Sequence, residues 1–259
     1  MKTSEPLDNE QIRLVIAPEH LFNLSGIDLL DTIDSTNTFL LNKARQGVSS
    51  GWVCLAEEQT QGRGRLGKSW YSPRGSNIYC SLLWRFSDSA QDISGLGIAV
   101  GVMVVNALMR YGISSGLELK WPNDVLAMSR NVYGILLESN SKGVVVIGVG
   151  INVDVSGAGE KNWIDLMELT GEPVRRNFLV GLLLDEMLTK IPEFERTGLE
   201  SFLPQWRKHD GLFNKNIQIL TPEKNITGVM RGINAAGELL LENESGMQVF
   251  RYGEVSVRF

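Results

Sequence analysis

One segment limits the fold of this chain more than any other: residues 93–109 are almost wholly apolar and include Gly95, Gly97 and Gly101. Such a run either crosses a membrane or lies in the core of a soluble protein. A helix that spans a membrane needs about 20 apolar residues. This segment is shorter, and it contains the polar residues Ser94 and Asn106. Its glycines allow a neighbouring backbone to approach closely. We therefore predict a buried helix packed on a sheet, and no membrane partner.

Strand-like segments lie on both sides of this helix. They are short, rich in β-branched and aromatic residues, and bounded by turn residues. The predicted strands cover residues 27–33, 52–56, 77–84, 117–121, 132–137 and 144–155. Helices are predicted at 36–46, with Ser35 or Thr36 as the cap, and at 176–191 and 199–208. The character of residues 10–24 stays open.

The pattern changes after Gly211. Short strands are predicted at residues 217–220, 226–233, 238–241, 249–252 and 255–259, with turns between them. Several short strands in so few residues are typical of a small β-barrel. We therefore predict three parts: an N-terminal extension (1–26), a catalytic domain (27–211) and a C-terminal barrel (212–259).

Charge and composition exclude several classes of protein. The chain has 259 residues and a formal net charge of −5, so no global basic field draws it to nucleic acid. The cysteines, Cys54 and Cys80, lie in apolar strand-like runs, which favours buried thiols over a disulfide or a metal site. His20 and His209 have no ligand-like spacing, so no metal site is predicted. The polar N-terminus lacks the core of a signal peptide, and we expect a cytoplasmic protein.

A glycine-rich basic loop fits two nucleotide-binding motifs. Residues 62–69 read GRGRLGKS, which matches both G-x-x-x-x-G-K-[ST] and G-x-G-x-x-G. Both motifs need a helix that begins at the end of the loop, because its N-terminus binds the phosphates. Here Pro73, Gly75 and Asn77 follow instead, and then a strand. The context predicts strand, loop, strand, and neither motif holds.

The loop still concentrates cations: Arg63, Arg65, Lys68 and Arg74. They can neutralise phosphate or carboxylate, and arginine does so with two parallel hydrogen bonds. Taken alone, the loop is as compatible with a solvated basic turn as with an anion site. The rest of the chain has to decide between them.

Four separated segments resemble the biotin protein ligases, in order and at similar spacing. They are residues 35–37 (STN), 59–70 (with GRGRLGKSW, followed by S-P-x-G-x-N), 120–124 (KWPND) and 148–152 (GVGIN). The resemblance covers roughly residues 27–259. It implies an α+β fold: a mixed, largely antiparallel central sheet with flanking helices, similar to class II synthetases, plus an SH3-like C-terminal barrel.

The resemblance also implies an activity. Such a ligase is ATP-dependent and AMP-forming: it joins biotin to AMP with ATP and Mg²⁺, then transfers biotin to a lysine of a biotin carboxyl carrier protein domain, as in acetyl-CoA carboxylase. The first step brings a carboxylate and a triphosphate together, so it needs cations more than a side-chain base. That agrees with the basic loop and with the absence of a placed histidine.

Site residues carry over by position. Catalytic roles are implied for Lys120, Arg63 and Arg65. Residues 134–137 would form part of the pocket wall, and Asp124 is a candidate to accept the proton of the acceptor lysine. The implied biotin contacts are Ser35, Thr36, Asn37, Gln59, Arg63, Gly64, Arg65 and Lys120; the implied ATP contacts are Arg65, Trp70, Lys120, Asn123 and Asn152.

Each assignment has a purely structural alternative. Ser35 and Thr36 could only cap a helix, Lys120 could point to solvent from a strand, and residues 121–124 could be only a turn. Two other functions also stay open: a lipoate or octanoate ligase or transferase of the same fold, and a non-catalytic nucleotide-binding module. Too few residues precede Ser35 for the DNA-binding domain of bifunctional family members, so we expect no DNA binding. The oligomeric state is open, with a homodimer as one option.

Overall fold

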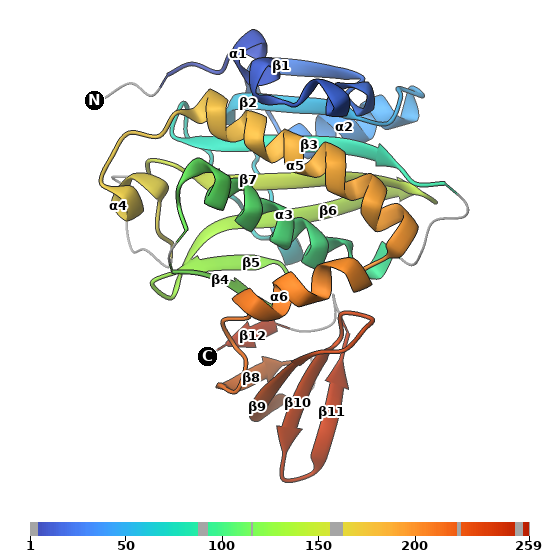
Figure 1. The fold of residues 1–259 in the computed structure, drawn as a ribbon, viewed down its shortest axis with the longest axis vertical. Helices are drawn as coiled ribbons and strands as arrows, with labels where there is room; N and C mark the ends of the chain where they lie inside the picture. The colour runs from blue at the N-terminus through green and yellow to red at the C-terminus, as the bar shows by residue number, and fades with distance from the viewer. Residues whose placement is uncertain are drawn as a thin grey trace.

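The computed structural model describes residues 5–87, 93–114, 116–155, 163–221, 224–251 and 256–258. It contains a large sheet of seven strands and a smaller sheet of five. The smaller sheet lies beyond one end of the larger one, along the long axis of the molecule (Figure 1). The large sheet has the strand order β1-β2-β3-β7-β6-β5-β4. Its strands are β1 (Gly26–Ile33), β2 (Trp52–Gln59), β3 (Asn77–Arg85), β4 (Leu117–Lys120), β5 (Asp124–Ala127), β6 (Arg130–Ser141) and β7 (Val144–Asn152).

Only β1 and β2 pair in parallel in this sheet; the other neighbours are antiparallel. The crossover between β1 and β2 is α2 (Thr36–Arg45), which a parallel connection requires. Ser35 caps this helix by accepting a hydrogen bond from the Thr38 N–H. The predicted mixed, largely antiparallel sheet with flanking helices is confirmed.

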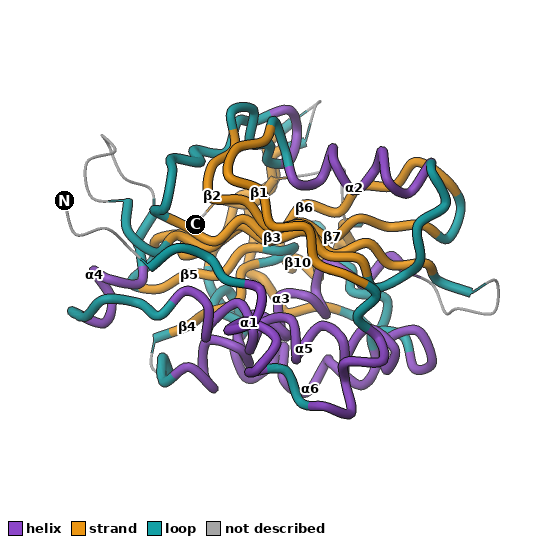
Figure 2. The backbone as a smooth tube through the Cα atoms, turned by 90° about the horizontal axis from the view of Figure 1, so that it is seen from above, coloured by secondary structure: helices purple, strands orange, loops and turns teal. Residues whose placement is uncertain are grey.

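Helices cover the sheet unequally. Figure 2 shows α1 (Asn9–Val15), α3 (Leu96–Tyr111), α5 (Arg176–Thr197) and α6 (Leu203–His209) on one side of the strands, and α2 on the other. The apolar segment 93–111 has a mean hydropathy of 1.7, long and apolar enough to cross a membrane, but 72% of it is buried inside the fold. It is the predicted core helix. The α2 side of the sheet is left partly open, and the site lies there.

The second sheet is antiparallel, in the order β11-β10-β9-β8-β12. Its strands are β8 (Asn216–Leu220), β9 (Asn225–Ile233), β10 (Leu239–Asn243), β11 (Gly246–Phe250) and β12 (Ser256–Arg258). It matches the small β-domain expected after Gly211, with β11 three residues earlier than predicted; residues 252–255 lie outside the described part. The division at residues 26/27 and 211/212 stays a prediction.

Three local predictions were incomplete. Residues 121–123 do form a turn, but Asp124 already belongs to β5, where it pairs with Lys120 across the hairpin. Residues 10–24, left open, are mostly helical, in α1 and the 3₁₀ helix Pro18–Asn23. Helix α5 continues past Pro192, which cannot donate to the Leu188 carbonyl. The Asn23 side chain donates to that carbonyl instead, at 2.9 Å. Because Asn23 lies 165 residues from Leu188, local sequence patterns could not predict this hydrogen bond.

Candidate functional site

A hollow of about 360 Å³ opens on the α2 side of the large sheet. Its floor is made by Gly134 of β6 and by Gly148 and Gly150 of β7; Gly134 and Gly150 are cross-strand partners. Side chains alternate along a strand, so these three positions face the same side. A Cβ at Gly148 would lie 2.3 Å from Asn37 Oδ1, and one at Gly150 2.7 Å from Trp70 Nε1. The glycines therefore leave room for the side chains of Asn37 and Trp70 against the sheet.

Buried and half-buried polar groups that bind one another form the end of the hollow beside α2, with Ser81 behind the lining. Gln59 Oε1 accepts from the Thr36 N–H (2.9 Å) and lies 3.1 Å from Thr36 Oγ1. Ser81 Oγ lies 2.7 Å from Thr36 Oγ1 and 2.6 Å from Asn37 Oδ1. The Asn37 amide donates to the carbonyl of Leu136 at 3.2 Å. This network holds neutral donors and acceptors in fixed positions, which suits a neutral polar ring.

The basic loop folds back on itself beside the hollow. Trp70 N donates to the Gly62 carbonyl (2.8 Å) and Gly64 N to the Lys68 carbonyl (2.7 Å). The loop's tip is a single 3₁₀ turn, Arg65–Gly67, and no helix begins at Lys68. Strands β2 and β3, on either side of the loop, pair antiparallel. The rejection of both nucleotide-binding motifs is confirmed.

Four cations line the hollow (Arg63, Arg65, Lys68 and Lys120), and three of them, at its mouth, each bind a polar side chain. The pairs are Arg63 with Glu138 (2.7 Å), Arg65 with Asn123 Oδ1 (2.7 Å) and Lys120 with Asp124 (3.4 Å). All six residues except Glu138 line the hollow. Cations that line one hollow can bind a carboxylate and a phosphate there. The Lys120 side chain is only 16% exposed, so the alternative of a solvent-pointing strand lysine is not what the structure shows.

The other wall of the hollow is aromatic. The ring of Trp70 lies against Gly134 and Gly150. Three buried polar atoms in this wall have no hydrogen-bond partner among the described residues: Trp70 Nε1, Trp163 Nε1 and Asn131 Oδ1. Buried polar atoms are rarely left unsatisfied in a folded protein. A flat ligand with its own donors and acceptors would satisfy them.

Two ionisable side chains near the floor of the hollow have pKa values raised far above neutral pH. Burial raises the pKa of the Cys80 thiol to about 12, and burial also raises that of the Tyr79 hydroxyl. Neither His20 nor His209 lines the hollow. The described residues also contain no group of three His, Cys, Asp or Glu side chains that could hold a metal.

The small sheet reaches the site. Trp121, which follows Lys120, is fully buried, and its Nε1 donates to the carbonyl of Gly237 in the small domain at 2.9 Å. The peptide bond between Trp121 and Pro122 is cis. Val257 of β12 lines the hollow. Contacts from the second domain thus help to hold the segment that carries Lys120.

Comparisons with known proteins decide the family. Residues 29–156 match the biotin/lipoate A/B protein ligase family, and residues 212–258 match the biotin protein ligase C-terminal domain. The bifunctional ligase/repressor BirA of Escherichia coli is 36% identical over 96% of this chain and 80% of its own. The chain belongs to the biotin protein ligase family. A biotin–[acetyl-CoA-carboxylase] ligase of Paracoccus denitrificans is 31% identical, over 88% of this chain and 98% of the relative.

Solved structures of biotin protein ligases have the same fold. One from Aquifex aeolicus, in complex with biotin and ATP, superposes with a TM-score of 0.81 at 28% identity, over 91% of this chain and 99% of that one. That protein therefore binds both ligands on a fold that this chain shares. The likeness includes the small C-terminal domain, because almost all of each chain is covered.

The expected biotin and ATP contacts all line one hollow, whereas of the expected wall residues 134–137 all but Leu137 line it. The hollow brings together four segments that are far apart in the sequence. The contacts are Ser35, Thr36, Asn37, Gln59, Arg63, Gly64, Arg65, Trp70, Lys120, Asn123 and Asn152. Their individual roles stay predictions.

Sequence reasoning missed several residues of the site. Ser81 is fully buried in the middle of β3 and connects Thr36 to Asn37. Glu138 holds Arg63 and also accepts from the Asn37 amide at 2.9 Å. A buried serine within an apolar strand is a weak signal that could have been noticed. Nothing local marks Glu138, because its partners lie 75 and 101 residues away.

Proposed function

We propose that this chain activates biotin with ATP to biotinyl-5′-AMP and transfers the biotin to a lysine of a biotin carboxyl carrier protein domain. The observation that carries the proposal is the single hollow with a neutral polar end, a mouth of three cations and an aromatic wall. These match, in order, the ureido ring, the carboxylate beside the α-phosphate, and the adenine. Two relatives that bear biotin ligase names support the same conclusion.

In the first step a carboxylate oxygen of biotin attacks the α-phosphorus of ATP. The bond from that phosphorus to the β-phosphate oxygen breaks, and pyrophosphate leaves. Both reactants are anions, so their mutual repulsion is the main obstacle, and positioned cations lower it. We assign this role to Lys120, Arg63 and Arg65. Each would exchange its present polar partner for a ligand oxygen.

Binding is assigned to the rest of the hollow. Ser35, Thr36, Asn37 and Gln59 would bind the ureido side of biotin, and Gly64 would cover its chain. Trp70 would cover the adenine, with Asn123 and Asn152 as further nucleotide contacts. Trp163 and Asn131 offer buried, unsatisfied polar atoms at the same wall.

Mg²⁺ would enter with ATP. Magnesium is commonly bound through one or two carboxylates and the phosphates of the substrate rather than by a protein cage. Asp124, which lines the hollow and lies 3.4 Å from Lys120, would be such a carboxylate. Bound there, the ion would neutralise charge on the phosphates.

In the second step the amine of the acceptor lysine attacks the carbonyl carbon of the mixed anhydride. AMP leaves, and the amine loses a proton. We propose Asp124 as the acceptor of that proton. We also propose a cytoplasmic location. We propose no DNA partner, because a net charge of −5 provides no global basic field.

The test is incubation with biotin, MgATP and a purified carrier domain, with avidin binding as the readout. Biotin-dependent exchange of pyrophosphate into ATP isolates the first step. We expect both signals with biotin and neither with lipoate or octanoate in its place. Pyrophosphate exchange that depends on lipoate but not on biotin would identify the chain as a lipoate ligase of the same fold.

A further inference from the structure

One buried ion pair lies just outside the hollow and is not part of the proposed chemistry. Arg176, the first residue of α5, is 0% exposed, and its guanidinium NH2 lies 2.6 Å from Glu57 Oε2 of β2. The side chain of Glu57 is 12% exposed. Burying two charges costs desolvation energy that their attraction often fails to offset. An arginine at a helix N-terminus is also disfavoured by the helix dipole. Stability alone therefore explains this pair poorly.

The pair holds the returning arm of the basic loop. Arg176 NH1 donates to the carbonyl of Gly75 at 3.1 Å, and Gly75 N donates to the carbonyl of Glu57 at 3.0 Å. Two residues along β2, Gln59 N donates to the carbonyl of Ser72 and Gln59 Nε2 to Ser72 Oγ, at 3.2 and 3.1 Å. The arm from Ser72 to Gly75 is thus fixed against β2 at the place where Gln59 enters the hollow.

The N-terminal segment covers this pair. Leu7 N donates to the second carboxylate oxygen of Glu57 at 2.6 Å. Asn177, beside Arg176, donates to the carbonyl of Pro6 and accepts from Asp8 N, at 2.9 and 2.8 Å. Residues 6–8 therefore lie over the buried charges and complete the hydrogen bonding of Glu57.

We infer that Glu57 and Arg176 are positioning residues for biotin binding, with residues 6–8 as their cover. They touch no ligand: neither lines the hollow. They act through Gln59 and Ser72, whose placement sets the polar end of the hollow. Because that end contacts biotin far from the reacting atoms, loosening it weakens binding equally in the ground and transition states. KM for biotin then rises, and kcat does not fall. This part rests on the function proposed above.

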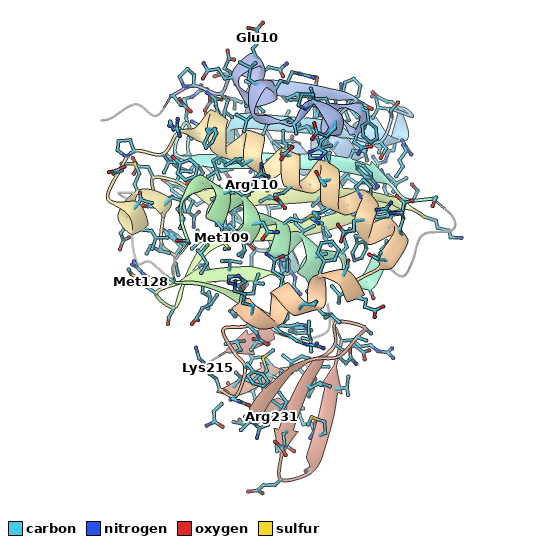
Figure 3. All side chains as sticks on the ribbon, in the orientation of Figure 1. Glu10, Met109, Arg110, Met128, Lys215 and Arg231 are labelled. Atoms are coloured by element: carbon cyan, nitrogen blue, oxygen red, sulfur yellow. The ribbon has the colours of Figure 1, made fainter. Side chains whose placement is uncertain are left out.

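A second attachment of the same N-terminal segment provides a matched control. Asp185, also on α5, accepts from Ala17 N (3.0 Å), lies 2.6 Å from His20 Nδ1 and pairs with Arg110 at 2.8 Å; Figure 3 labels Arg110 on α3. Asp185 is as buried as the first pair but does not line the hollow. Asp185→Asn should lower stability without affecting the loop.

The experiment compares Glu57→Gln, Arg176→Lys and Asp185→Asn in the full chain. One readout needs no activity: the rate of tryptic cleavage after Arg74 in the ligand-free protein. The other is pyrophosphate exchange with biotin varied, well below the Tm of every variant. We expect the first two variants to be cleaved several-fold faster and to raise KM for biotin by about three- to tenfold, with kcat within about twofold. Asp185→Asn should match the wild type in both readouts.

Wild-type KM and wild-type cleavage in Glu57→Gln and Arg176→Lys would overturn the inference, whatever their Tm. A fall in kcat with constant KM would also overturn it. If Arg176→Lys does not fold, Glu57→Gln decides alone, because glutamine has the same shape and keeps an acceptor for Leu7 N. If the wild type itself shows no biotin-dependent exchange, the proposed function fails, and the cleavage rates still decide whether the pair holds the loop.

Discussion

The two ends of the hollow are built in opposite ways. At the polar end, Thr36, Asn37, Gln59 and Ser81 are bound to one another, and their geometry is set before any ligand arrives. At the mouth, each cation is held by a side chain that a ligand anion can replace. A neutral ring is recognised best by a rigid, preorganised set of groups. Charged reactants need cations that can change partners as they bind and react, and the mouth supplies these.

The largest effect should come from the mouth. Losing a charged hydrogen bond costs about 1.5–3 kcal/mol, and more if it strengthens in the transition state. At about 1.36 kcal/mol per factor of ten, Lys120→Ala should slow biotin-dependent adenylate formation by at least roughly tenfold to a hundredfold. Pyrophosphate exchange at saturating biotin and ATP measures this. Normal exchange by Lys120→Ala would remove Lys120 from the reacting centre.

Gly148→Ala tests the rigid end. The new Cβ would meet Asn37 Oδ1 at 2.3 Å, and Asn37 is held by Ser81 and Glu138. Overpacking a site of this kind costs about 1–3 kcal/mol. We expect KM for biotin to rise by about tenfold while KM for ATP stays unchanged. Equal rises in both would show that the two ends are not separate.

Lys68→Ala examines a cation of the basic loop that lines the hollow but whose side chain is exposed. A solvent-exposed charge contributes little, so apparent MgATP affinity should fall by about tenfold or less, with turnover retained. Exchange with ATP varied gives the answer. If Lys68→Ala abolished turnover and Lys120→Ala did not, the phosphate-loop interpretation would return and the ligase assignment would be wrong.

Loop mobility provides a smaller effect. Residues 61–76 combine glycines with cations that repel one another, so an anion should order them. Trypsin should therefore cleave after Arg63 and Arg65 several-fold more slowly when biotinyl-5′-AMP is present. Biotin alone, which fills the rigid end, should protect less. Equal cleavage rates without ligand, with biotin and with biotinyl-5′-AMP would contradict the idea that the cations of the mouth exchange their side-chain partners for a ligand anion.

The smallest effect is expected at the thiols. Cys80 lines the hollow, yet burial raises its pKa to about 12, and burial also raises the pKa of Cys54. Almost no thiolate is present at neutral pH, and only the thiolate is nucleophilic. Iodoacetamide should leave the exchange activity of the native protein intact over a period in which it modifies the unfolded chain. Rapid inactivation by iodoacetamide that biotin prevents would show that the floor of the hollow opens enough to expose Cys80.

Most of the fold could be predicted from local patterns. The strand runs, the apolar core helix and the Ser35 cap depend on periodicity and on neighbouring residues, which the sequence displays directly. The same reasoning rejected both nucleotide-binding motifs, since Pro73 and Gly75 exclude a helix after the loop. Strand β5 was missed because it has only four residues and begins directly after the turn of residues 121–123.

For the site, sequence reasoning identified the residues that carry chemistry, because side-chain type and spacing state what each can bind. It did not identify Ser81, Glu138 or the Glu57–Arg176 pair. Their importance comes from strand register and from contacts such as the one between Arg176 and Glu57, 119 residues apart. A charge or hydroxyl alone does not reveal its partner. Which groups are buried together, and therefore must satisfy one another, was decided only when the chain folded.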